Sequence, residues 1–382
     1  MRLLLATVAL AGCAPEAIPA AATTATVTLH ADLEPGAEVT WCQYVLPGEV
    51  SPDGLWVAGL EHETRGVTTH HVIWYQMAET PASVANKRGP FRCDGGVHLR
   101  KRGILYAPPS GDGRIQWPDG VAARLGPQDV TLIEWHVLNP GTQPASGHVT
   151  VRTLPPTTAT PIRAGTLLLY DWFVYVPPQS VVTSRMRCRI QSDATLMWAS
   201  QHMHKRGVAF EARLLDRYGA PVRELLHTTQ WDADPVPFPE GVPIERGQLV
   251  EFTCSWANTG TEAVIEGDAA GDEMCMFVGG YFPAIDRPFG ETCEISADSG
   301  PVFGGTATCA ESLACLSRVT SRVEAHACWF ATRAEDSAAL VELAWSCASA
   351  RCSETCTREG FTPSCLTCLS AQCADAAGRC TG

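Results

Sequence analysis

Two groups of side chains in this chain have the chemical types and the spacing of metal ligands. The first group combines two adjacent histidines with a distant third, His70, His71 and His136. The second combines an HxH pair with a methionine, His202, His204 and Met274. Imidazole binds several first-row metals, and a thioether beside two imidazoles favours the softer Cu(I). The six residues therefore predict two separate copper sites, and a redox metal indicates oxidative chemistry rather than hydrolysis.

The HxH pair fits a β-strand. Positions i and i+2 of a strand face the same side, so a strand over residues 195–204 lets His202 and His204 reach one ion while Met203 faces away. Met274 lies in the stretch Asp272-Glu273-Met274-Cys275, which is unusually polar for a core methionine. The alternative is that Met274 only fills a gap in the core, because methionine adapts readily to irregular spaces.

The adjacent pair His70–His71 needs a local irregularity. Neighbours on a regular strand point to opposite faces, so both can bind one ion only at a bulge, at a strand end or through different ring nitrogens. His136 lies near the end of a predicted strand over residues 131–138. A histidine of this kind, considered alone, more often has a structural role than a ligand role.

The elements that must position these side chains are predicted to be strands. Short apolar or alternating runs, broken by proline and glycine, fill residues 27–151 and continue after the proline-rich stretch 153–161, which we interpret as a linker. No convincing amphipathic helix interrupts them. The pattern predicts a mainly β fold with two tandem antiparallel β-sandwiches, over residues 27–156 and 157–293.

The composition changes after about Cys293, where residues 300–382 contain ten cysteines and are rich in Ala, Ser and Glu. Residues 334–348 have helical periodicity. We predict a small disulfide-rich helical module with up to five disulfides, and this module is a candidate contact surface for another protein. The pair Cys365-x-x-Cys368 could instead help to bind zinc, although no second CxxC pair is present.

The N-terminus has the features of an export signal. Residues 1–12 form a short apolar segment, and Leu10-Ala11-Gly12-Cys13 resembles the bacterial lipobox, in which the cysteine is lipidated. The alternative is an ordinary signal peptide that contains Cys13 by chance. Residues 13–26 form a flexible tether, and removing Cys13 from the 17 cysteines leaves an even number, which suits disulfides. We therefore expect an exported bacterial lipoprotein, periplasmic or on the cell surface, that is membrane-anchored by its N-terminal lipid. Its net charge of −13 argues against nucleic acid as a partner.

In chain order these motifs resemble those of the copper type II, ascorbate-dependent monooxygenases, which include peptide-amidating and dopamine-hydroxylating enzymes. The likeness spans about residues 27–293, and its motifs are Thr40-Trp41-Cys42, His70-His71, Glu134-x-His136-x-x-Asn139-Pro140, His202-x-His204 and Asp272-Glu273-Met274-Cys275. The resemblance implies two jelly-roll-like β-sandwich domains that face each other across a solvent-filled cleft, with one copper in each. It also implies ascorbate as the electron donor, and dioxygen and a small organic molecule as substrates, with hydroxylation of a C–H bond.

The resemblance assigns a role to each ligand set. His70, His71 and His136 would hold the electron-transfer copper, and His202, His204 and Met274 would hold the copper that binds dioxygen. No catalytic side chain beyond these ligands is implied. The implied disulfides are Cys42–Cys93, Cys188–Cys293 and Cys254–Cys275.

Substrate identity does not carry over from the resemblance. Peptide-amidating members have an arginine where this chain has Ser200, and an asparagine and a tyrosine where it has Met276 and Val278. Without these polar groups the chain lacks the means to hold a peptide carboxylate, so glycine-extended peptides are predicted to be poor substrates. Two other functions stay open: an exported copper carrier without hydroxylase activity, and a surface scaffold that uses the tail for contacts.

Overall fold

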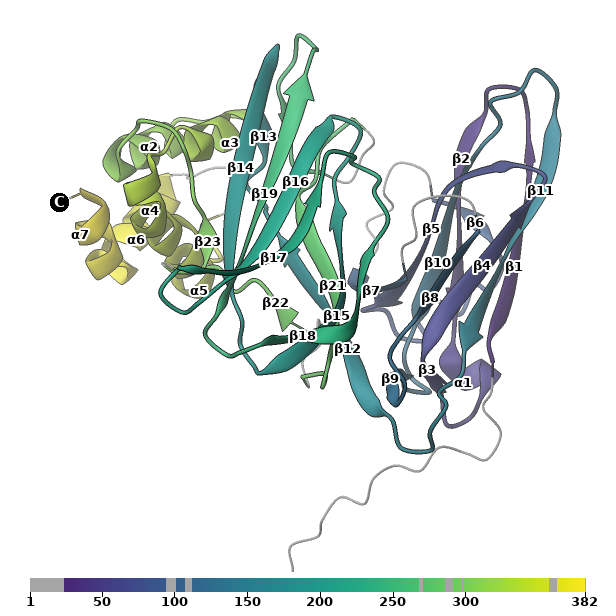
Figure 1. The fold of residues 1–382 in the computed structure, drawn as a ribbon. Coiled ribbons are helices and arrows are strands. Elements are labelled where there is room, and N and C mark those ends of the chain that lie inside the picture. The colour runs from purple at the N-terminus through teal and green to yellow at the C-terminus, as the bar shows by residue number, and fades with distance from the viewer. Residues whose placement is uncertain are drawn as a thin grey trace, which may run out of the picture.

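The predicted architecture, two β-sandwiches followed by a small helical module, is confirmed (Figure 1). The structure is a computed structural model that describes residues 24–93, 101–106, 112–267, 271–285, 291–296, 298–356 and 363–381. Cys13 and the predicted signal and lipobox lie outside these residues. None of the described helices combines the length and the apolar character needed to cross a membrane.

The first sandwich contains a four-stranded sheet in the order β1-β11-β4-β8 and a five-stranded sheet in the order β6-β2-β10-β5-β7. Alternate residues of these strands point into one core, where Leu29, Trp74 and Trp135 are fully buried. A short helix, α1 (Pro47–Val50), follows β2. The strands are β1 (Thr26–Leu33), β2 (Glu38–Val45), β4 (Gly59–Arg65), β5 (Thr68–Met77), β6 (Phe91–Arg92), β7 (Lys101–Tyr106), β8 (Gly113–Gln116), β10 (Thr131–Leu138) and β11 (Ala145–Leu154).

The second sandwich repeats this arrangement with β18-β15-β21-β12 on one side and β17-β16-β19-β14-β23 on the other. Its core includes the fully buried Phe252, Trp256 and Phe277. Two short strands, β13 (Tyr175–Val176) and β20 (Val264–Ile265), pair with each other, and β22 (Glu291–Thr292) pairs with β12. The other strands are β12 (Ile162–Tyr170), β14 (Ser180–Arg189), β15 (Ala194–His202), β16 (Gly207–Leu215), β17 (Pro221–Thr228), β18 (Val236–Ile244), β19 (Leu249–Asn258), β21 (Met276–Phe282) and β23 (Gly300–Pro301).

The two sandwiches are joined through a shared sheet. β12 of the second half pairs in parallel with β9 (Val121–Leu125) of the first, and β9 pairs in turn with β3 (Leu55–Val57). Trp198, Met276 and Val278 of the second half also pack into the core of the first. Hydrogen bonds and apolar burial together therefore hold the halves in a defined relative position.

The helical module packs on the side of the second sandwich that faces away from the first (Figure 1). The ring of Phe173 lies 4.9 Å from those of Trp329 and Trp345 and 5.7 Å from that of Phe303, measured between centroids. The helical segments of the module are α2 (Cys309–Leu316), α3 (Arg322–Phe330), the short 3-10 segment η1 (Ala334–Asp336), α4 (Ser337–Val341), the π-helical segment η2 (Glu342–Cys347), α5 (Ala348–Arg351), α6 (Pro363–Gln372) and α7 (Ala374–Thr381).

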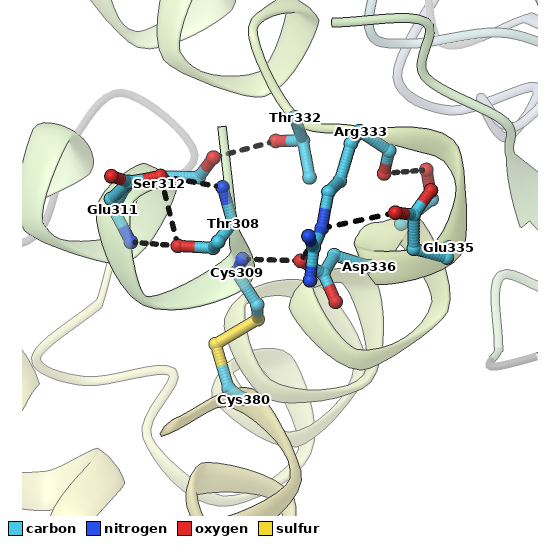
Figure 2. Close-up of polar contacts among 10 residues, drawn as sticks. Thr308, Cys309, Glu311, Ser312, Thr332, Arg333, Glu335, Asp336 and Cys380 are labelled. Carbon is cyan, nitrogen blue, oxygen red and sulfur yellow. Dashed lines mark hydrogen bonds and ion pairs between the residues drawn. A yellow bond between two sulfur atoms is a disulfide. The ribbon is translucent and has the colours of Figure 1, made fainter. Parts of the chain in front are cut away.

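Local polar contacts and disulfides define the module. Figure 2 shows that α2 begins with a capping box, in which Thr308 Oγ1 accepts from the N–H of Glu311 and the Glu311 carboxylate accepts from the N–H of Thr308. The sequence predicts up to five disulfides here, and the structure contains five: Cys309–Cys380, Cys315–Cys328, Cys347–Cys373, Cys352–Cys368 and Cys356–Cys365. Both cysteines of the CxxC pair are bonded to other partners, so neither is left as a thiolate for zinc.

The three disulfides implied for the sandwiches are also the pairs that the structure forms. Cys42 is joined to Cys93, Cys188 to Cys293, and Cys254 to Cys275.

Candidate metal centres

A β-bulge brings the adjacent histidines of the first set to one side of the sheet. In the pairing of β10 with β5, His136 lies opposite His71, but the next residue, Val137, lies opposite Thr69. His70 is therefore the extra residue of a bulge, which turns its side chain out of the strict alternation. This bulge supplies the irregularity that two neighbouring ligands require.

The three imidazoles of the first set converge. One ring nitrogen from each of His70, His71 and His136 lies within 4.8 Å of those of the other two. The ring centroids are 4.8 to 5.2 Å apart. Within the part of the chain that the structure describes, this is the one group of three or more His, Cys, Asp or Glu side chains with metal-binding spacing.

Carboxylates behind the rings select which nitrogens face the centre. His71 Nε2 lies 3.4 Å from Glu134 Oε1, and His136 Nε2 lies 2.7 Å from Glu38 Oε1. When each Nε2 carries the proton, Nδ1 keeps its lone pair. His71 Nδ1 lies only 3.1 Å from Nδ1 of His70, and two facing lone pairs repel unless a cation or a shared proton lies between them. The donor set therefore fits a bound metal ion.

The electrostatics of the first set favour neutral rings. Burial lowers the pKa of His70 to about 4, and the neighbouring His71 and His136 add to this effect. Burial, assisted by His71, likewise lowers the pKa of His136. Since only neutral imidazole binds a metal, both rings are in the ligand form at neutral pH without first losing a proton.

The second set gathers at the ends of two paired strands. β15 pairs antiparallel with β21, and His202 lies opposite Met276. His204 and Met274 lie just beyond these strands, and His204 bonds to Asp272 and Glu273, the two residues before Met274. The His202 and His204 rings lie 5.5 Å apart between centroids, and Met203 is buried in the second core. The strand ends at His202 and not at 204, because the N–H of His204 donates to Glu273 and not to a neighbouring strand.

Buried polar groups fix the geometry of the second set. His204 Nδ1 lies 2.9 Å from the carbonyl oxygen of Asp272, so Nδ1 carries the proton and Nε2 is the nitrogen with a lone pair. The fully buried carboxylate of Glu273 accepts from the N–H groups of His204 and Arg206, both at 3.0 Å. Burial raises the pKa of Glu273, and these two hydrogen bonds oppose that rise.

Met274 is 6% exposed and its neighbour Cys275 is bonded to Cys254 on β19. The polar side chain of Glu273, next to Met274, holds the HxH segment through hydrogen bonds, and Asp272 contributes its backbone carbonyl oxygen. The thioether itself is buried, so the described contacts are compatible with either a ligand or a core role. The softness of sulfur beside two imidazoles fits Cu(I).

Residues of both ligand sets line one cavity of about 70 Å³ between the sandwiches. His70 and His71 contribute from one side, and His202 contributes from the other. The rest of the lining is largely apolar, with Ser200, Gln201 and Asp232 as its other polar members. The remaining lining residues are Ile73, Ile104, Ile115, Trp198, Trp231, Ala233, Pro235 and Val278.

Two residues of these centres are not predictable as functional from the sequence. In the sequence Glu273 is only one residue of a polar stretch, whereas in the structure it connects the two ligand-bearing segments of the second set. Trp231 has no motif around it, yet its ring stacks on His70 at 5.4 Å between centroids and an interplanar angle of 24°. Loop residues of this kind show no periodicity, so only the three-dimensional structure reveals them.

Comparisons with known proteins agree with the chemistry of the second set. Residues 162–300 match the family model described as the copper type II ascorbate-dependent monooxygenase, C-terminal domain. No curated protein matches the chain. Among solved structures, PNGase F, a glycosylasparaginase from Flavobacterium meningosepticum, is 8% identical with a TM-score of 0.29, over 67% of this chain and 95% of that chain. Residues 162–300, which form most of the second sandwich, are therefore similar to the C-terminal domain of the copper type II ascorbate-dependent monooxygenases.

Proposed function

We propose that this protein is a copper- and ascorbate-dependent monooxygenase that binds two coppers and hydroxylates a C–H bond of a small organic substrate. The observation that carries the proposal is that one cavity is lined by members of both ligand sets, His70 and His71 of the first and His202 of the second. The all-imidazole set suits an electron-transfer ion, and the set with a thioether suits the ion that meets dioxygen. The match of residues 162–300 to the family model supports the reaction class.

In this proposal, bound copper supplies one-electron redox chemistry and the activation of dioxygen. The protein's own groups orient and protect the ligands. Glu38 and Glu134 keep the protons of His136 and His71 on Nε2, while Asp272 keeps the proton of His204 on Nδ1. Glu273 holds the backbone of the HxH segment beside Met274. The apolar lining limits the water that could compete with the substrate.

The cavity lining supports a substrate without a carboxylate. Ser200 and Val278 both line the cavity, at positions where peptide-amidating enzymes carry an arginine and a tyrosine. Among the described residues that line it, none is an arginine or a lysine. A carboxylate placed there would lack a cationic partner, so the substrate is predicted to be largely apolar and not a glycine-extended peptide.

The test is turnover by the copper-loaded protein with ascorbate and labelled dioxygen. Incorporation of one labelled oxygen into an organic product, coupled to ascorbate oxidation, is the expected result. Copper binding without any labelled product across a broad panel of small molecules would favour the copper carrier. A preparation that binds no copper would favour the scaffold. Rapid hydroxylation of a glycine-extended peptide would contradict the substrate proposal alone.

We also propose that the protein works outside the cytoplasm, anchored by a lipid on Cys13. The eight disulfides support an oxidising compartment. Labelled fatty acid should be incorporated into the wild-type protein and not into Cys13→Ala, and the variant should leave the membrane fraction. Equal labelling of both proteins would contradict this assignment.

A further inference from the structure

Trp231 belongs to the second sandwich but lies on a ligand of the first. It is in the connection between β17 and β18, and its ring is nearly parallel to that of His70, at 24°, with 5.4 Å between centroids. Both residues line the cavity. Trp231 is therefore a direct contact between the second sandwich and the first ligand set.

The backbone of Trp231 is fixed to the segment that carries the second ligand set. Gln201, next to His202, donates its side-chain amide to the carbonyl oxygens of Gln230 (3.1 Å) and Trp231 (2.9 Å). Gln201 is 7% exposed, so these bonds are shielded from water. A Cβ added at Gly207 would lie 3.0 Å from the Cβ of Trp231, which shows how closely the loop packs on the start of β16.

These contacts form a short chain from one ligand set to the other. It runs from His202 through Gln201 to the backbone of Trp231, and from the Trp231 ring to His70. The pairing of β12 with β9 joins the sandwiches elsewhere, and none of the six predicted ligands lies on these two strands, although His202 ends β15 of the same sheet. The position of His70 relative to His202 thus depends on the Trp231 loop as well as on the shared sheet.

We propose that Trp231 is a positioning residue that holds His70 at a fixed distance from the His202–His204 segment, so that both ligand sets face one cavity. The inference rests on the proposed binding of copper at both sets. An aromatic ring suits this role because it offers a flat, rigid surface to the imidazole with few rotatable bonds. Gln201 acts through Trp231 by holding its loop.

The test is the distance distribution between the two Cu(II) ions of the loaded full-length protein, measured by pulsed dipolar EPR. Wild type should give one narrow distribution, and Trp231→Phe, which keeps an aromatic ring, should leave it nearly unchanged. Trp231→Ala should shift it and broaden it, and Gln201→Ala should change it in the same direction. The matched control is Trp345→Ala, since Trp345 is half-buried like Trp231 but packs on Phe173 at the helical module and does not line the cavity.

The outcomes separate this inference from the proposed function. A wild-type protein that binds fewer than two coppers would overturn the proposed function, and the inference with it. Two coppers in the wild type with the same distribution in Trp231→Ala would overturn the inference alone. The same broadening in Trp345→Ala, together with an equal fall in melting temperature, would reduce the effect of Trp231 to general destabilisation and would also overturn the inference.

Discussion

The five-stranded sheets of the two sandwiches correspond strand by strand. In the first, β10 lies between β2 and β5, and in the second, β19 lies between β14 and β16. β19 ends at Asn258, and Asn139 directly follows β10. Each donates its side-chain amide to three backbone carbonyls and accepts an N–H two residues later. The two halves therefore repeat one another down to a single hydrogen-bonded asparagine.

The bulge that gathers the first ligand set is repeated as well. His136, three residues before Asn139, pairs with His71, and Ser255, three residues before Asn258, pairs with Ala209. In both halves the next pair along the ladder skips one residue of the partner strand, β5 or β16. The second sandwich thus places Val208, Ala209 and Ser255 where the first places its three histidines. This comparison teaches that the bulge belongs to the shared fold, and that side chains alone convert it into a ligand set.

The second ligand set uses the opposite sheet and a different device. β15 precedes β16 as β4 precedes β5, but the connection is residues 203–206 in place of residues 66–67. The longer connection gives room for His204 to leave the sheet and bond to residues 272 and 273. At the end of β4, Arg65 instead forms ion pairs with Glu63 and Asp112. Each ligand set is therefore particular to its own sandwich.

The largest effects should come from removing one ligand of each set. His70→Ala and His204→Ala should each lose one of the two coppers and lower kcat by at least about 100-fold. Removing only a residue that hydrogen-bonds to a metal ligand already costs about 10–100-fold in metal affinity or activity, and removing the ligand itself should cost more. Metal content and turnover measure this. His148→Ala is the control, since His148 pairs with His30 on the other sheet of the first sandwich, and the variant should keep both coppers. A single-ligand variant that keeps two coppers would contradict the assignment of that set.

Removing one disulfide from each sandwich should show whether its effect is on stability alone or also on the position of a metal ligand. Chain entropy predicts that Cys42→Ala/Cys93→Ala, which opens a loop of 51 residues, costs about 4 kcal/mol of unfolding free energy, and that Cys254→Ala/Cys275→Ala, with 21 residues, costs about 3 kcal/mol. The second pair should nevertheless weaken Cu(I) binding more, because Cys275 adjoins Met274. Urea unfolding and Cu(I) competition titrations measure the two effects. Equal Cu(I) affinities in both variants would show that the Cys254–Cys275 bond does not hold the Met274 ligand.

The comparison also shows what the sequence can predict. The ligand types, the strands that carry them and the need for an irregularity at His70–His71 all follow from local patterns, since strand alternation acts over a few residues. The parallel pairing of β9 with β12 and the strand end at His202 do not follow, because both depend on contacts between distant segments. The same reason hides Trp231, whose partner is 161 positions away in sequence.

The carboxylates behind the two sets differ in burial, and this difference can be tested. Glu273 is fully buried and accepts two backbone N–H groups, whereas the side chain of Glu134 is 14% exposed and lies 3.4 Å from His71 Nε2. Glu273→Ala should weaken copper binding at the second set by about 10–100-fold, and Glu134→Ala should have a smaller effect at the first. Glu273→Gln should be intermediate, because its amide oxygen can still accept a hydrogen bond. A larger loss in Glu134→Ala, measured by competition titration, would reverse the proposed order.

The smallest expected effect is also the most direct test of the shared bulge. Val208→His, Ala209→His and Ser255→His together should reproduce the first ligand set on the second sandwich and bind one additional Cu(II). Residue 255 lies opposite residue 183 as His136 lies opposite Thr40, so the strand positions correspond. Binding should nevertheless be weaker than at the native set, because the variant has no carboxylates equivalent to Glu38 and Glu134. The double variant without Ser255→His is the control and should bind the extra ion far more weakly. If isothermal titration detects no third copper in the triple variant, the bulge alone cannot gather the ligands, and the carboxylates behind the rings must be essential to the first set.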